Sequence, residues 1–499
     1  MARKLIFKEG NNLLGTIDNG FRAVGYDGTV ISEQYGATIS AIGGGGTGTV
    51  NVDGVTIQGD GTLGNPLLAT STYYSNVIFV DEVNGNDGSG AVNDFKKPMS
   101  SIVNTLSLAS SLYPTSTNKA LIYVRRGYYY IDYPTTLVDY VDFYFEPGSI
   151  VSSGRFSDQY ASAAVNVNFM GYADLEYVDF LFNKDSTVNI EVNNVNTPAA
   201  ALLVIPLSGT ATVNYTANKV VTDTQGTAYG ITVRNSSNVT VNIRQEFRSP
   251  HSNFYLRSHS GKFVVNCPNI ILTSNNYYGG NWKSGIKIEL GNGGTMVVNG
   301  NLVNEDTNGY LGGQSGMISR LANDSNELVT LNGNIYAGDT FGLYGLGIGS
   351  NSKTIINGSV ISNHLVSYVA NTCVSVFKNG VLVNNNTQAS ASTYPVLSMG
   401  GSGIVWVENC HIYSYGASSS LVSAFWKDTT TATLNVYNTV YSGATSSGFF
   451  IRNSAGGQPV NNVRIHNCRA TKPLDTNITD LLSPTGFTQD ANIQALNFI

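Results

Sequence analysis

One short pattern recurs along most of this chain: an apolar residue, any residue, an apolar residue, any residue and then asparagine. The asparagine is usually followed by Gly, Cys or Thr, as in TIING, VWVENC and NVYNT. Successive copies lie 22 to 33 residues apart, and a repeat of this length is typical of stacked supersecondary units. The repeat asparagines are Asn189, Asn214, Asn242, Asn266, Asn299, Asn332, Asn357, Asn379, Asn409, Asn438 and Asn467.

The content of these repeats limits the fold. Each repeat contains short β-rich stretches separated by Gly, Asn and Ser, and helical periodicity is rare. Strands this short cannot bury an apolar face alone, whereas coils stacked on one another bury a continuous apolar column. The sequence therefore predicts an all-β solenoid, a parallel β-helix in which every coil adds one strand to each of several sheets.

The repeat asparagine has a structural explanation. Asparagine tolerates a left-handed backbone at a turn and bonds to nearby main chain. When such turns stack, each side-chain amide can also bond to the next, which predicts a ladder along the solenoid. The members expected in this ladder are Asn266, Asn299, Asn332, Asn357, Asn379, Asn409, Asn438 and Asn467.

The repeats occupy residues 151–470, and three other segments flank them. Residues 1–72 form a Gly-rich leader with too few apolar residues for a core of their own, so they are expected to pack against something else. Residues 73–150 predict a cap that opens the β-helix. Residues 471–499 leave the repeat pattern, and they predict a C-terminal cap or a trimer-locking strand, because an open solenoid end exposes an unpaired edge.

A short helix is expected within the opening cap, over Pro98–Leu112. Ser100 or Ser101 is the predicted N-cap, since serine side chains accept from the orphan N–H groups of a first helical turn. Strand candidates precede and follow the helix, in VIFVDEV and ALIYVRRGYYYID. The residues expected on its buried face are Ile102, Leu106 and Ala109.

Charge and hydropathy exclude several classes of protein. Only 12% of residues are charged, against about 25% in ordinary globular proteins. The formal net charge is −6 and the 27 basic residues are scattered, whereas nucleic-acid binding needs clustered Lys and Arg. No run reaches the about 18 apolar residues of a membrane span. The N-terminal MARKLIFKEG lacks the apolar core of a signal peptide.

Two segments resemble known families. VIFVDEVNGNDGSG, followed by KKPMSSIVNTLSLA and ALIYVRRGYYYID, resembles the start of right-handed parallel β-helices of the pectate-lyase-like type. The leader, with VDGVTIQGDGTLGNPL, is similar to repeats near the virion-attachment end of bacteriophage fibre and tailspike proteins. The resemblance implies a homotrimeric, elongated virion appendage that binds other virion proteins through its N-terminal region. It also implies assembly in the host cytoplasm and release by lysis.

Tailspikes that resemble this chain often cleave surface polysaccharide with paired carboxylates, acting as glycoside hydrolases or polysaccharide lyases. The strongest local candidates for such a pair are Asp174, Glu176 and Asp179 in ADLEYVDF. Residues 174 and 176 share one face of a strand, about 6–7 Å apart, a separation that suits a general acid and its partner. The alternative is a solvated strand face, which we favour.

Aromatic residues offer a second kind of candidate site. Tyr and Trp have flat apolar faces with a polar edge, which suits sugar rings. Tyr277, Tyr278 and Trp282 in NNYYGGNW and Trp406 in VWVENC are the candidate glycan contacts. Packing between chains of a trimer, or a stacked aromatic column, explains the same residues and remains the preferred alternative.

No cofactor or metal site is expected. Asp81, Asn84, Asn86 and Asp87 could offer oxygen ligands to Ca²⁺, but their spacing is not that of a helix-loop-helix calcium site, and turns of the Asx type explain them better. The four cysteines, Cys267, Cys373, Cys410 and Cys468, are widely spaced, so buried thiols are expected rather than a zinc site or a disulfide scaffold.

These observations predict a structural virion protein. It is a trimeric phage fibre of tail or head that contacts the host surface or its glycans, and it neither binds nucleic acid nor spans a membrane. A tailspike depolymerase of the same fold is the alternative. A bacterial adhesin is the third hypothesis, and the missing export signal disfavours it.

Overall fold

The computed structural model describes most of the chain after residue 73 and several short strands before it. The described residues are 5–9, 12–18, 22–25, 30–32, 57–58, 68–69 and 74–489, except 199, 224–228, 251, 274–283, 290–291, 306–315, 321–325, 339–340, 346–351, 364, 370–371, 386–394, 416–422, 428–430, 444–448, 454–459, 475–477 and 481–486. Two compact units result, Met1–Asn76 with Thr117–Lys119, and Val77–Ser116 with Ala120–Ile499.

The first unit contains two small antiparallel sheets. Four strands pair in sequence order, β1 (Leu5–Glu9), β2 (Asn12–Asp18), β3 (Arg22–Gly25) and β4 (Val30–Ser32). A second pair joins β5 (Ile57–Gln58) to β6 (Leu68–Ala69). Sequence reasoning did not expect the four-stranded sheet, because it took residues 1–72 as a whole to have too few apolar residues for a core of their own.

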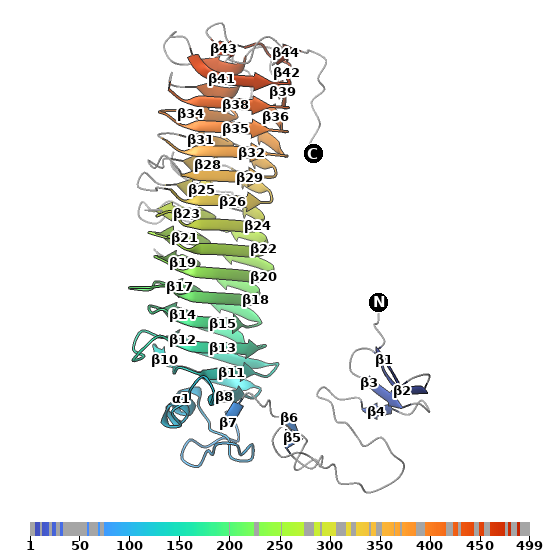
Figure 1. Cartoon of the computed structure of the whole chain (residues 1–499), viewed down its shortest axis with the longest axis vertical. Helices are drawn as coiled ribbons and strands as arrows, with labels where there is room; N and C mark the ends of the chain where they lie inside the picture. Colours follow the sequence, from blue (N-terminus) through green and yellow to red (C-terminus); the bar gives the residue numbers. More distant parts are fainter. Residues whose placement is uncertain are drawn as a thin grey trace. The chain divides into compact units, whose positions relative to one another are not determined.

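The second unit is a parallel β-helix, as the repeats predict. Its coils stack in sequence order, from the blue cap to the orange and red strands (Figure 1). Strands that follow one another along the chain belong to different faces, and each pairs in parallel with its counterpart in the next coil. Three such faces run along the solenoid, and we name them faces A, B and C.

Face A carries the repeat pattern. Its strands are β8 (Lys119–Val124), β11 (Val141–Phe145), β13 (Asn166–Gly171), β15 (Thr187–Glu191), the first parts of β18 (Thr212–Thr222), β20 (Asn238–Ser249), β22 (Lys262–Leu272) and β24 (Thr295–Asn304), then β26 (Leu328–Asn332), β29 (Lys353–Asn357), β32 (Val374–Lys378), β35 (Ile404–Glu408), β38 (Thr433–Tyr437), β41 (Val460–His466) and β43 (Ile478–Asp480).

Face B follows face A around each coil. Its strands are β9 (Gly127–Tyr130), the first parts of β12 (Ser149–Ser157) and β14 (Asp174–Phe182), β16 (Asn194–Thr197), the second parts of β18, β20, β22 and β24, then β27 (Ile335–Gly338), β30 (Val360–Ser362), β33 (Val381–Asn384), β36 (His411–Ser414), β39 (Val440–Gly443), β42 (Cys468–Ala470) and β44 (Phe487–Gln489).

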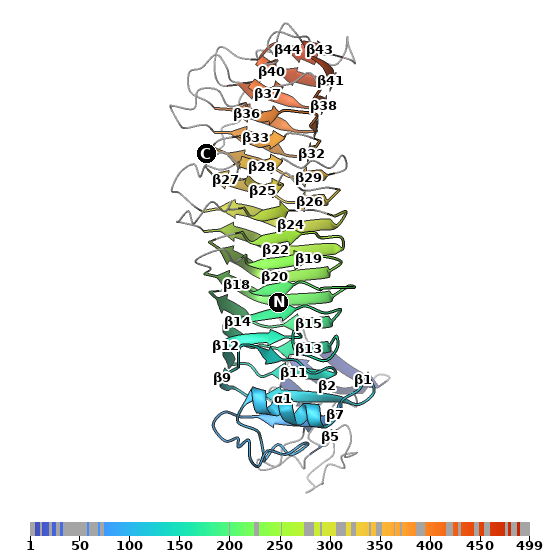
Figure 2. The same ribbon diagram turned by 90° about the vertical axis from the view of Figure 1, so that its left-hand side faces the viewer.

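Face C completes the coil (Figure 2). Its strands are β10 (Thr135–Thr136), the second parts of β12 and β14, β17 (Leu202–Val204), β19 (Ile231–Arg234), β21 (Phe254–Arg257), β23 (Ile286–Glu289), β25 (Gly316–Arg320), β28 (Phe341–Gly345), β31 (Ser367–Val369), β34 (Leu397–Met399), β37 (Ser423–Lys427) and β40 (Phe449–Asn453).

Side chains that point inward form one continuous apolar core through the solenoid. Near its start the core is aromatic: the rings of Phe143 and Phe169 stack with centroids 4.7 Å apart and planes 1° apart, and Phe156 and Phe180 pack beside them. Farther along, Val, Ile and Leu fill the same positions. Full burial of each large apolar side chain contributes about 1.5–3 kcal/mol.

The cap that opens the solenoid contains β7 (Tyr74–Val80) and the helix α1 (Ile102–Ser111). The helix confirms the sequence prediction. Ser101 is the N-cap, and its side chain accepts from the Asn104 N–H. The buried face is Ile102, Leu106 and Ala109 as expected, together with Thr105.

The described part of the C-terminal segment differs from the expectation that residues 471–499 leave the repeat. Strand β43 pairs in parallel with β41 on face A, and β44 pairs with β42 on face B. The asparagine pattern stops near residue 470, but the described strands beyond it continue the coil geometry.

Candidate functional site

The repeat asparagines lie at the end of the face A strands and bond to one another along the solenoid. Within a run, the Nδ2 of each asparagine donates to the Oδ1 of the asparagine one coil earlier, as from Asn299 to Asn266 at 2.7 Å and from Asn332 to Asn299 at 2.8 Å. The ladder has three runs: Asn168–Asn189–Asn214, Asn242–Asn266–Asn299–Asn332–Asn357 and Asn379–Asn409–Asn438–Asn467.

The described ladder is interrupted twice, between Asn214 and Asn242 and between Asn357 and Asn379. Only the second interruption lies in the row from Asn266 to Asn467 that sequence reasoning expected to be continuous. In the second interruption Asn357 pairs in register with Lys378, so Asn379 lies one residue beyond the expected position. The last four asparagines also adopt the left-handed backbone, with φ between 50° and 56°. A one-residue change in strand length thus moves the amides into a separate row.

The corner between faces A and B becomes shorter along the chain. Between the paired asparagines and the first face B partner lie residues 243–245 in β20, 267–268 in β22 and only Gly300 in β24. An open hollow of about 490 Å³ lies at this step. Its lining residues are Thr216, Asn242, Ile243, Arg244, Asn266, Cys267, Pro268 and Asn299.

The three candidate carboxylates do not come together on one face. Asp174 and Glu176 are half-buried on face B and flank the buried Leu175. Tyr177 has a φ of 60° and turns the strand, so Asp179 lies beyond the corner, in register with Arg155. The expectation that residues 174 and 176 share a strand face is confirmed, and the grouping with Asp179 is not.

Each of these carboxylates already has partners within the solenoid. Asp179 is 2% exposed and receives two hydrogen bonds from Arg155, at 2.6 and 2.7 Å. Asp174 Oδ1 accepts from Asn193 Nδ2 and from the backbone N and Nδ2 of Asn194.

Glu176 Oε2 accepts a hydrogen bond from the Tyr128 hydroxyl at 3.1 Å. Both carboxylate oxygens of Asp179 accept hydrogen bonds from Arg155, so neither is left to contact a substrate.

Of the aromatic candidates, Tyr277, Tyr278 and Trp282 lie outside the described residues. Trp406 points outward from face A and is 37% exposed. Its ring stacks on Tyr437 one coil later, with centroids 5.8 Å apart and planes 14° apart. The Tyr437 ring lies 6.2 Å from the His466 ring in turn, so three rings form an aromatic row over successive coils.

Sequence reasoning missed a second aromatic cluster, on face C. The rings of Tyr229 and Tyr255 stack 4.0 Å apart, and the Lys287 ammonium lies over both. Burial raises the pKa of the Tyr255 phenol beyond its usual range, and the neighbouring Glu289 carboxylate adds to the shift. The register between β21 and β23 brings Tyr255 and Lys287 together, and neither residue belongs to a sequence motif.

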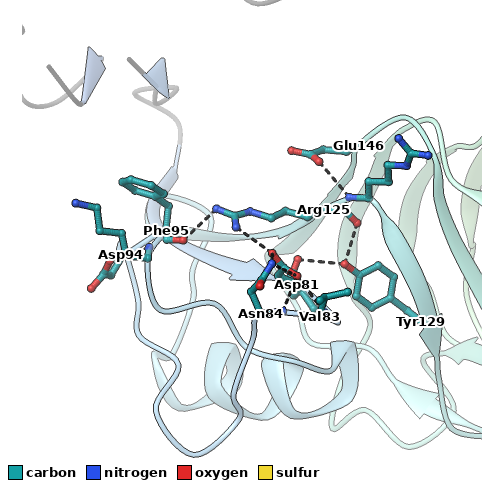
Figure 3. A network of polar contacts seen from close by, with 11 residues as sticks. Asp81, Val83, Asn84, Asp94, Phe95, Arg125, Tyr129 and Glu146 are labelled. Atoms are coloured by element: carbon teal, nitrogen blue, oxygen red, sulfur yellow. Dashed lines mark hydrogen bonds and ion pairs between the residues drawn. The ribbon is translucent and has the colours of Figure 1, made fainter. Parts of the chain in front are cut away.

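The polar loop before α1 forms turns, with Asp81 at their centre (Figure 3). Asp81 Oδ1 accepts from the backbone N–H groups of Val83 and Asn84, and Asp81 Oδ2 pairs with Arg125 at 3.1 Å. Arg125 also donates to the Phe95 carbonyl. The Tyr129 hydroxyl donates nearby, to the carbonyl of Arg125 or Val80. These contacts hold the loop against the first coil.

Asp87 connects the same loop to the helix. Its carboxylate accepts from the backbone N–H groups of Ser100 and Ser101, from the Ser101 hydroxyl and from Asn104 Nδ2. Burial alone raises the pKa of this carboxyl, but the hydrogen bonds outweigh burial and lower the pKa to about 2. Among the described residues, no three His, Cys, Asp or Glu side chains gather as metal ligands would.

All four cysteines are buried thiols, as the sequence predicts. Burial raises the pKa of Cys267 to about 12 and that of Cys410 to about 11. Because the thiolate is the nucleophile, neither thiol is suited to covalent catalysis near neutral pH.

A buried ion pair that sequence reasoning missed joins His259 to Glu327. Nδ1 of the imidazole lies 2.9 Å from Glu327 Oε1 and Nε2 lies 3.2 Å from the Ser237 carbonyl, with both side chains fully buried. A Cβ on Gly294 would lie 2.4 Å from His259 Nδ1. The contact between His259 and Glu327 therefore requires glycine at position 294 on the intervening coil. It joins residues that are 68 positions apart in the sequence.

Comparison with known proteins gives no relatives. No family model, no curated protein and no solved structure matches the chain. Over the part of the chain that the structure describes, no helix has the length and apolar content needed to cross a membrane.

Proposed function

We propose that this chain is a structural virion protein, a trimeric phage fibre that attaches through its N-terminal region and contacts the host surface. The observation that carries the proposal is the long parallel β-helix that follows a separate N-terminal unit. A solenoid of paired coils gives an extended and stiff support. The likeness of residues 1–150 to phage fibre and tailspike segments supplies the virion context.

The described carboxylates favour a support over a depolymerase. Asp179 is neutralised by Arg155, and Asp174 accepts three hydrogen bonds from two asparagines. These contacts stabilise successive coils, which is the role that a fibre requires. Glu176 has the fewest contacts of the three, so Glu176→Gln is the variant that tests the depolymerase. Release of reducing ends from host polysaccharide, lost in Glu176→Gln, would replace the fibre proposal with an enzyme.

Electron microscopy of labelled virions tests the proposal directly. Antibody raised against residues 150–470 is applied to intact particles from the source of the protein. Label at the tail tip supports a receptor-binding fibre, and label around the capsid supports a head fibre. Particles without label would overturn the virion assignment and favour the adhesin.

Light scattering of the purified full chain tests the trimer. Closed three-fold symmetry predicts three times the 53.2 kDa chain mass. A mass of one or two chains would contradict the trimer but would leave the assignment of the β-helix fold unchanged.

We propose the aromatic row Trp406–Tyr437–His466 as the surface through which the fibre contacts glycans. The row is on face A, and both Trp406, which is 37% exposed, and His466 are exposed to solvent. Weak contacts repeated on three chains gain strength through effective concentration. Trp406→Ala is expected to reduce adhesion of the fibre to host cells, whereas Tyr336→Ala removes a ring of similar exposure, 42%, from face B and serves as the control.

A further inference from the structure

Four consecutive coils place the same dipeptide at the corner between faces A and B. Asparagine ends the face A strand or follows it directly, and glycine comes next. The pairs are Asn299–Gly300, Asn332–Gly333, Asn357–Gly358 and Asn379–Gly380.

The corner geometry requires glycine in these pairs. A Cβ on Gly300 would lie 1.6 Å from the Cys267 carbonyl oxygen, and one on Gly333 would lie 2.1 Å from the Gly300 oxygen. The same clash recurs for Gly358 against Gly333 at 2.1 Å and for Gly380 against Gly358 at 2.0 Å. Backbone therefore lies against backbone at each step, and no other residue type fits.

An asparagine followed by glycine is chemically labile. The glycine nitrogen attacks the side-chain Cγ of asparagine, a C–N bond forms, and ammonia leaves to give a succinimide. Water then opens the ring to aspartate or isoaspartate. Glycine favours the first step because it has no side chain to hinder the approach. The fold thus demands, four coils in a row, the dipeptide that is most prone to this reaction.

The contacts around these pairs oppose the reaction. Asn332 Nδ2 donates to Asn299 Oδ1 at 2.8 Å, and Asn332 Oδ1 accepts from Asn357 at 2.9 Å. The attacking atom is also engaged, because the Gly333 N–H donates to the Asn357 carbonyl at 3.1 Å. The Gly358 N–H likewise donates to the Lys378 carbonyl at 3.1 Å. Attack requires the carboxamide to leave its ladder bonds and the glycine nitrogen to lose its acceptor.

We propose that the asparagine ladder protects the corner Asn-Gly pairs from deamidation, and that Asn379, at the interruption of the ladder, is the least protected of the four. Asn379 Oδ1 accepts from Asn409 at 3.1 Å, but its register removes it from Asn357. Asn299 and Asn332 are inner members of their run and make both ladder bonds, and Asn357, at the end of that run, still donates to Asn332. This inference concerns the chemistry of the solenoid and does not depend on the proposed function.

Deamidation would damage the ladder itself. Aspartate at position 332 has no N–H to donate, so it would place a carboxylate oxygen against Asn299 Oδ1. Isoaspartate would also lengthen the backbone by one atom at the tightest point of the coil. The first event in a run would therefore weaken the asparagine one coil earlier, because that residue loses its donor.

The test compares deamidation rates at the four pairs within one molecule. The full chain is incubated in mildly alkaline buffer, native and in urea, and peptide mapping by mass spectrometry follows the conversion of amide to acid at each site. Native Asn299 and Asn332 are expected to react at least about tenfold more slowly than in urea, since two side-chain hydrogen bonds must break before attack. Asn379 is expected to be the fastest of the four in the native chain.

Variants distinguish protection by the ladder hydrogen bonds from protection by the rigidity of the backbone. Asn299→Ala removes the acceptor of Asn332 and is expected to raise the rate at Asn332 about five- to tenfold. Asn299→Asp keeps an acceptor oxygen and is expected to leave that rate low. Asn189→Ala is the matched control, because Asn189 is the middle member of another run and makes the same two bonds. Circular dichroism shows whether each variant remains folded.

Two results would overturn the proposal. One is native Asn299 and Asn332 reacting as fast as in urea. The other is a folded Asn299→Ala chain in which Asn332 reacts at the unaltered rate, which would assign any protection to the backbone alone.

Discussion

Asp179 and Arg155 illustrate how single residues hold this solenoid together. They lie on adjacent coils, 24 residues apart in sequence, and the pair is bidentate with Asp179 almost fully buried. The Arg155 guanidinium also lies 4.5 Å from the centre of the Tyr133 ring. A carboxylate in such a setting stabilises the coil boundary.

We predict that breaking this pair costs stability. Asp179→Asn leaves the Arg155 charge without its partner and is expected to lower the free energy of unfolding by about 3 kcal/mol. Arg155→Met combined with Asp179→Leu removes both charges and is expected to cost less than either single change. Chemical denaturation of the two single variants and the double variant measures the difference, and simple additivity of the costs would contradict it.

Asp87 gives the cap a dependence on pH. Its folded pKa of about 2 is below the ordinary value of 3.8. The carboxylate therefore contributes stability that is complete above about pH 4 and is lost as the pH falls toward 2. Because Asp87 is half-buried, screening reduces the contribution to about 1–2 kcal/mol.

Hydrogen exchange in α1 measures this contribution between about pH 2 and pH 5. The native helix is expected to lose protection across that range, whereas Asp87→Asn is expected to be less protected at neutral pH and to change little on acidification. Asp94→Asn, in the same loop, should retain the native pH dependence. A native profile without a decline below about pH 4 would contradict the prediction.

The residue scale also shows what sequence can predict of the candidate site. Members of the asparagine ladder follow from a repeat that is visible in the sequence. The pairing of Arg155 with Asp179 and that of His259 with Glu327 could not be predicted. The coils differ in length, so the sequence does not indicate which residues lie in register on adjacent coils. For the same reason the break after Asn357 was not foreseen.

At the scale of elements, the corners between faces vary in length from coil to coil more than the strands do. The corner between faces A and B contracts to a single glycine by Gly300 and stays tight through Gly380. Strands of face A such as β15, β26 and β29 alternate buried and outward residues. Strand periodicity was therefore readable from sequence, whereas corner length and register were not.

Gly333→Ala tests the tight corner. The added methyl would lie 2.1 Å from the Gly300 oxygen, so the coil must shift, and a loss of about 2–4 kcal/mol is expected. Gly400→Ala is the matched control, because its nearest neighbour would be the Tyr368 hydroxyl at 3.8 Å. Thermal unfolding measures both variants, and equal melting temperatures would show that the corner can relax.

Secondary structure outside the repeats was predictable where local signals were strong. The helix α1 has a serine N-cap and a regular apolar face, and both were identified. The antiparallel sheet of β1–β4 was not, because its strands are short and its pairing depends on partners along the chain rather than on any turn motif that we recognised.

At the scale of the whole molecule, the continuous core lies within the second unit. Removal of residues 1–72 is expected to leave the melting temperature of the solenoid within a few degrees of the full chain, while abolishing attachment to virions if the proposed function holds. Calorimetry and a virion-binding assay measure the two effects separately. A truncated chain that fails to fold would contradict the independence of the solenoid.

The stacking of coils also has a mechanical consequence. Hydrogen bonds between successive coils occur on three faces, so a pull along the solenoid is shared by three sheets at every boundary. The boundary between β29 and β32 has these backbone bonds but lacks the amide bond that joins Asn332 to Asn357 one coil earlier. Under tension we expect the column to part first at an interruption of the ladder, which would therefore limit the strength of the solenoid.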